Sequence, residues 1–114
     1  MPPSPPRVDS ALLRELAEAE RASARAQAVV TLRRPDPAQL PTPEQTEAAA
    51  RRVIEHAATE TGERPAALNV FRNLNAFAVE ASAAFIRSVL TREEVQSARS
   101  NRAPESGRMP RPAR

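Results

Sequence analysis

The sequence predicts an α+β domain: a four-stranded antiparallel sheet with two helices on one face, preceded by an extra N-terminal helix. Short runs of alternating apolar and polar residues are typical of strands, and a capped amphipathic segment with a second helical segment supplies the two helices. The predicted strands occupy residues 28–34, 68–71, 77–81 and 95–101. The order of elements after the extra helix is therefore β-α-β-β-α-β.

The extra helix is expected over residues 10–23. Asp9 or Ser10 can cap its N-terminus. Leu12, Leu13 and Leu16 form a short apolar stripe, and beyond residue 20 alanine is the only apolar residue of the segment. Because this core face is poor, we expect the helix to dock loosely.

The first strand and the long helix follow from local signals. AVVTLRR, residues 28–34, is rich in β-branched residues, and the prolines of PDPAQLP end it. Thr42, Pro43 and Gln45 form a capping box with proline at the first helical position, and Gly62 is a C-cap signal. The helix between them is expected over residues 43–61. Its apolar face consists of Ala50, Val53, Ile54, Ala57 and Ala58.

Residues 69–82, NVFRNLNAFAVEAS, are expected to form a hairpin that holds two of the three Phe residues. Phe77 should face the helices as core, whereas Phe71 should lie on the opposite face. Ser82 can cap the second helix, AAFIRSVLT, and VQSARSN gives a weaker last strand.

Right-handed crossovers place both helices on one face of such a ferredoxin-like sheet, with the first and third strands in its centre. The other face remains open to water or to a partner. Its apolar groups either bind a partner or are covered by the N-terminal helix. The residues expected on this face are Val29, Thr31, Asn69, Phe71, Ala78 and Glu80.

The two ends of the chain lack the apolar residues that offset the entropy of ordering. We therefore expect a disordered Pro-rich N-terminus over residues 1–9, the N-terminal helix over 10–24, the domain over 25–102 and a flexible basic tail over 103–114. From residue 99 to residue 114 there are five Arg and one Glu, whereas the net charge of the whole chain is +3. The positive charge thus belongs to the tail.

The chain lacks the residues on which most kinds of catalytic and metal-binding site depend. The chain has no Cys, a single His (His56) and two Gly (Gly62 and Gly107), which argues against thiolate sites, zinc sites and phosphate-binding loops. The adjacent carboxylates Glu93 and Glu94 are expected to be solvated. We expect no enzyme activity, no metal and no cofactor. Without a signal-like or membrane-spanning apolar run, the expected location is the cytoplasm.

RNA-recognition modules share the β-α-β-β-α-β order and stack bases on exposed aromatic residues. Only Phe71 or Phe77 could do so here, and the chain has no basic-Gly-aromatic signature. RNA binding therefore remains a less favoured alternative. A protein-interaction module of this fold, whose partner is not a protease, is favoured over RNA binding.

Residues 28–102 resemble the propeptide of subtilisin-like serine proteases, the inhibitor I9 type. The resemblance rests on the strand VVTLRR, a long helix ending in ETGERP, the segment FRNLNAFAVEAS, and the helix AFIRSVL followed by VQSARSNR. Ala76 stands where the family usually has Gly, so Asn75 is expected to take the left-handed turn position. Ala98 stands where a larger Val is usual, which should weaken burial of the last strand.

The resemblance implies a stand-alone inhibitor or folding helper of a subtilisin-like protease, since no protease domain follows residue 114. In the family, the open sheet face packs on the protease and the chain after the last strand lies in the substrate cleft. By spacing from Ala98, the primary pocket would take a residue near Ser106 to Arg108. The implied contact residues are Phe71, Glu80, Ser100, Asn101, Arg102, Ala103, Pro104, Glu105, Ser106, Gly107 and Arg108.

Overall fold

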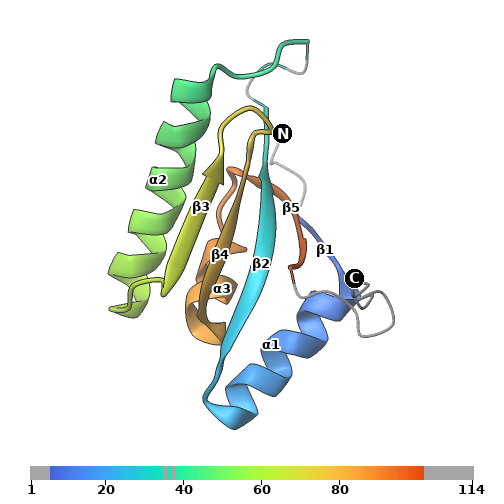
Figure 1. Cartoon of the computed structure of the whole chain (residues 1–114), viewed down its shortest axis with the longest axis vertical. Coiled ribbons are helices and arrows are strands. Elements are labelled where there is room, and N and C mark those ends of the chain that lie inside the picture. Colours follow the sequence, from blue (N-terminus) through green and yellow to red (C-terminus); the bar gives the residue numbers. More distant parts are fainter. Residues whose placement is uncertain (1–5, 35, 37, 102–114) are drawn as a thin grey trace, which may run out of the picture.

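The computed structural model describes residues 6–34, 36 and 38–101, and it confirms the predicted α+β class. Three helices pack against a five-stranded mixed sheet (Figure 1). The strand order is β1-β5-β2-β4-β3, in which β1 is parallel to β5 and the other neighbours are antiparallel. The elements are β1 (Arg7–Val8), α1 (Ser10–Ala22), β2 (Arg25–Leu32), α2 (Pro43–Thr61), β3 (Ala67–Phe71), β4 (Ala76–Ser82), α3 (Ala83–Val89) and β5 (Val95–Ser100).

The sheet has one strand more than predicted. Arg7 and Val8, which the sequence assigned to a disordered N-terminus, pair with Ser97 and Ala98 of β5. The backbone N–H of Asp9 then donates to the carbonyl oxygen of Ala98 at 3.0 Å. Val8 packs against the core. Composition gave no signal of β1, because a two-residue strand needs only one apolar side chain and the edge of a neighbouring strand.

Strand β2 begins at Arg25, three residues earlier than predicted. Ser23 ends α1 in the left-handed conformation, with φ of 53°, and so turns the chain directly into β2. In the added part, Ala26 is buried between exposed Arg25 and Gln27. The Ala-rich segment hid this boundary, because alanine favours helices and the left-handed position holds Ser instead of the usual Gly.

The expected loose docking of α1 is wrong. Leu12 and Leu16 are 0% exposed and belong to the same hydrophobic core as α2, α3 and the sheet. Phe77 and Phe85, also 0% exposed, fill the centre of that core. All three helices therefore cover one sheet face, and α1 does not cover the other.

The predicted caps of α2 and α3 form as expected, whereas Asp9 precedes α1 without a capping hydrogen bond from its side chain. Thr42 and Gln45 make the reciprocal capping box at the start of α2, which spans the predicted residues 43–61. Gly62 ends α2 with φ of 72°, and Ser82 accepts a hydrogen bond from the backbone N–H of Phe85 at 3.1 Å. Ala98 is 4% exposed in the core, so the smaller residue does not prevent burial of β5.

Asn75 connects the hairpin turn to two other elements. It takes the predicted left-handed position, with φ of 54°, and is 6% exposed. Its Nδ2 donates to the carbonyl oxygen of Leu32 at 2.8 Å, and its Oδ1 accepts from Thr46 Oγ1 at 3.1 Å. The backbone N–H of Leu32 donates to the carbonyl oxygen of Asn75 at 2.8 Å. The turn is thereby tied to the end of β2 and the first turn of α2.

Replacing this side chain should destabilise the domain strongly. We expect Asn75→Ala to lower the free energy of unfolding by about 2–4 kcal/mol, because it leaves buried groups of Leu32 and Thr46 without partners. Asn75→Gly should cost roughly 1 kcal/mol less, since glycine adopts positive φ without strain. Urea unfolding of both variants measures the difference, and equal losses would show that the left-handed backbone contributes nothing.

Candidate functional site

The sheet face opposite the helices, which we call the open face, is a candidate binding surface. The strand pairing places Asn69, Ala78, Val29 and Arg99 in one row across four strands. The next row runs from Phe71 through β4, β2 and β5 to β1. All six residues predicted on this face lie there, and none of the described helices packs on it.

The centre of the open face is made of small side chains. Ala76 is 6% exposed and Val29 is 9% exposed, although no helix covers either. The expected apolar patch is therefore much reduced, and Phe71, which is half-buried, is its main aromatic contribution. A flat surface of this kind allows another protein surface to approach closely over a wide area.

A shallow hollow of about 270 Å³ lies on the open face over β3, β4 and the first part of β2. Phe71, Glu80 and Asn101 line it together with Gln27 and Asn69. The structure thus brings together three of the residues predicted to contact a partner. A second hollow of about 480 Å³ lies beside it, over β2, β5 and β1.

The remaining predicted contact residues are placed differently. Ser100 is two residues beyond buried Ala98 and lies on the helical side, where its hydroxyl donates to the carboxylate of Glu15. It therefore does not belong to the open face. Residues 102–108 lie outside the described part of the chain.

Sequence reasoning missed Gln27, Arg7 and Arg99 as residues of the open face. Gln27 lines the hollow, and Arg7 and Arg99 line the second one. Gln27 escaped notice because β2 was predicted to start after it. The alternation of Arg25 and Gln27 with alanines was the available signal.

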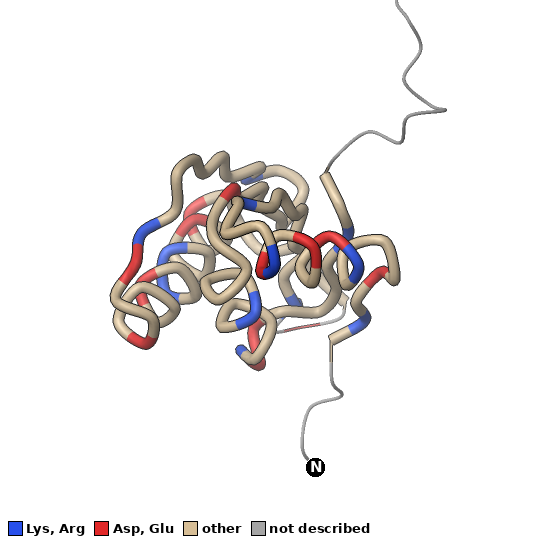
Figure 2. The backbone as a smooth tube through the Cα atoms, turned by 90° about the horizontal axis from the view of Figure 1, so that it is seen from below, with Lys and Arg blue, Asp and Glu red and all other residues tan. Residues whose placement is uncertain are grey.

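Charges are balanced over the folded part of the chain. Four of the seventeen Arg residues and one of the fourteen acidic residues follow residue 101, so residues 6–101 hold thirteen of each. Figure 2 shows the two signs interleaved along the backbone. A domain whose charges balance has no excess of positive charge of the kind that favours nucleic-acid binding. Phe77, one of the two aromatic residues considered for base stacking, is buried in the core.

His56 and Glu94, which were considered for metal binding or catalysis, contact neighbouring arginines. Arg92 Nη1 lies 3.4 Å from His56 Nδ1, and Arg92 Nε donates to Glu94 Oε1 at 3.1 Å. Arg52 Nε lies 3.8 Å from the other oxygen of Glu94. Across residues 6–34, 36 and 38–101, no group of three potential metal ligands comes together. This cluster links α2 to the segment before β5.

Comparisons with family models, with curated proteins and with solved structures find no match to this chain. Within the described residues, no helix combines the length and the apolar character needed to cross a bilayer. The open face and the place where β5 ends are therefore the features of this chain that bear on its function.

The Glu94 cluster should make stability depend on pH. Partial burial raises the pKa of the Glu94 carboxyl, but its own backbone N–H, Arg92 and Arg52 outweigh that effect and hold the pKa below its ordinary value of 4.5. The resulting stabilisation is fully present above pH 4.5 and is lost as the pH falls through the lower folded-state pKa. Glu94→Gln should therefore lower the free energy of unfolding by up to about 1 kcal/mol at pH 7 and by less at pH 3.

The matched control for this measurement is Glu93→Gln, which removes the neighbouring carboxylate. The side chain of Glu93 forms no ion pair with another described residue, although the backbone carbonyl oxygen of Glu93 accepts a hydrogen bond from Arg33 Nε at 2.9 Å. Urea unfolding at both pH values compares the two variants. The interpretation fails if Glu94→Gln costs as much at pH 3 as at pH 7.

Proposed function

We propose that this protein is an inhibitor, or folding helper, of a subtilisin-like serine protease. The observation that carries the proposal is the hollow on the open face, lined by Phe71, Glu80 and Asn101 at the point where β5 leads into the C-terminal segment. The order β5-β2-β4-β3 supports a ferredoxin-like arrangement of the four strands after α1. This arrangement is the one expected of the propeptide family that the sequence resembles.

The open face is suited to docking on a folded partner. Its small central residues leave the sheet flat, while Phe71 supplies an aromatic group at one end. Arg25 Nη1 lies 4.0 Å from Glu80 Oε2, so that carboxylate is only loosely held and can exchange partners. Aromatic and arginine side chains around a desolvated centre are the usual anchors of protein interfaces.

The chain after β5 would supply the inhibitory contact. In this proposal, residues near Ser106 to Arg108 lie extended in the substrate cleft, where main-chain hydrogen bonds give affinity and side-chain pockets give specificity. The docked domain raises the effective concentration of that segment at the cleft. Inhibition then requires slow release of the segment.

The roles of the open face and of the segment after β5 can both be tested with purified subtilisin-like proteases. The full chain should inhibit at least one of them, and a chain ending at Asn101 should lose most of the inhibition while it keeps weak binding. Ala78→Arg places a large cation in the centre of the open face. It should weaken inhibition about tenfold or more, because the centre of an interface is desolvated and the guanidinium would lose its water there. Ala48→Arg, on the exposed side of α2, makes the same change away from this face and should have no effect.

Three results would count against the proposal. The tail mechanism is wrong if the full and shortened chains inhibit equally. The docking surface is wrong if Ala78→Arg and Ala48→Arg behave alike. Absence of inhibition by the full chain, together with a non-protease partner whose binding is sensitive to Ala78→Arg, would favour the alternative protein-interaction module.

A further inference from the structure

The N-terminal part of β2 has an edge that is largely unpaired. Arg25, Ala26 and Gln27 pair with β4 on one side. On the other side β5 ends opposite Ala28, and beyond it only the carbonyl oxygen of Gln27 accepts a hydrogen bond, from the backbone N–H of Asn101. Among the described residues, no strand continues β5 along this edge. Such an edge can accept an added strand through its free backbone groups.

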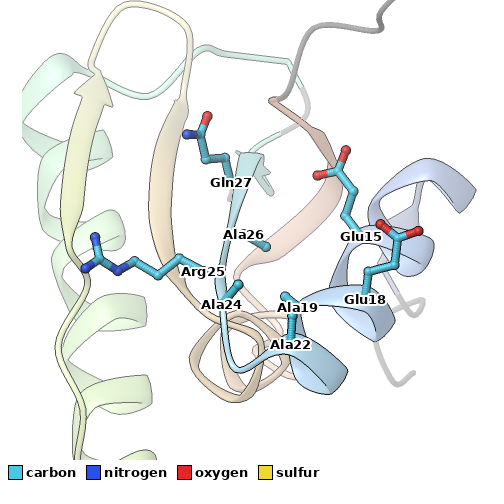
Figure 3. Close-up of a pocket in the computed structure, with 8 residues that line it drawn as sticks. All are labelled: Glu15, Glu18, Ala19, Ala22, Ala24, Arg25, Ala26 and Gln27. Atoms are coloured by element: carbon cyan, nitrogen blue, oxygen red, sulfur yellow. The ribbon is translucent and has the colours of Figure 1, made fainter.

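A groove runs beside this edge. It has a volume of about 270 Å³ and lies between the second half of α1 and the start of β2. Figure 3 shows its alanines between the two elements and the carboxylates of Glu15 and Glu18 projecting from α1 on one side. Arg25 extends away from α1 in this view and pairs with Glu80 on the open face, so it does not neutralise these carboxylates. The groove is thus lined by small side chains and has carboxylates at one side.

The end of β5 lies at the rim of this groove, because Ser100 and Asn101 contact Glu15 and Gln27, two of the residues that line it. Figure 1 shows β5 ending close to α1, beside β2. Ser100 already contacts Glu15, and the backbone N–H of Asn101 donates to the carbonyl oxygen of Gln27 at 3.2 Å. The chain therefore leaves the described structure at the rim of the groove, in register with β2.

We propose that residues Arg102–Pro104 of the same chain occupy this groove as a continuation of β5. Continuing the Ala28–Ser100 register places Arg102 opposite Ala26 and Ala103 opposite Arg25. Side chains alternate, so Arg102 lies on the same side as Ser100, facing α1 and its acidic residues. Because β5 runs parallel to α1, Arg102 comes beside Glu18, one turn after Glu15.

The proline in this segment fits the same register. Asn101 donates to β2, so alternation directs the N–H of Ala103 toward β2 and the nitrogen of Pro104 away from it. Proline is tolerated where the backbone nitrogen faces away from the ladder. The docking does not depend on the proposed function, and it leaves the chain from Glu105 onward available to a partner.

Amide hydrogen exchange of the full chain, followed by NMR, tests the docking. After correction for intrinsic rates, the Ala103 amide should exchange about tenfold more slowly than that of Gly107. Glu18→Arg should abolish this protection, and Arg102→Glu combined with Glu18→Arg should restore it. Glu93→Arg makes the same charge change in the segment before β5, so it should leave the protection intact.

The proposal is overturned if Ala103 exchanges as fast as Gly107 in the unaltered chain. It is also overturned if Glu18→Arg keeps the protection while the core amides remain protected. Protection that rises with protein concentration would mean that a second copy fills the groove. Unchanged protection on dilution supports occupation by the chain's own segment.

Discussion

The hydrogen bonds of Asn75 fix how the hairpin, β2 and α2 meet. Because the side chain is buried and both of its polar groups are used, the turn has one position relative to Leu32 and Thr46. That position sets the register of β3 and β4. A slip of one residue would exchange the faces of Phe71 and Phe77, which would put an aromatic ring into water and empty the core centre.

Local signals predicted much of this fold, and long-range pairing decided the rest. The bounds of α2 followed from a capping box and a glycine, and the faces of β3 and β4 followed from alternation. Strand β1 could not be predicted, because two residues carry no periodic pattern and pair with a strand about ninety residues away. Of the candidate site, Phe71 and Glu80 were placed on the correct face. Ser100 was not, although its spacing from Ala98 already indicated the helical side.

The distribution of charge separates the roles of the two parts of the chain. The folded part has no net charge, so an open face that docks on a partner would select it mainly by shape, main-chain contacts and a few polar groups around small residues. The positive charge follows residue 101 and can act over a longer range, until salt screens it. Recognition by the domain and attraction by the tail would therefore respond differently to ionic strength.

The pairing of β1 with β5 has a consequence for how the chain folds during synthesis. Strand β2 lies between β4 and β5, both of which follow it, and β1 has only β5 as a neighbour. Because β5 ends at Ser100, the sheet is incomplete until residue 100 has left the ribosome. The apolar side of α1 must wait for surfaces made later, which makes the nascent chain dependent on protection from aggregation until its last strand arrives.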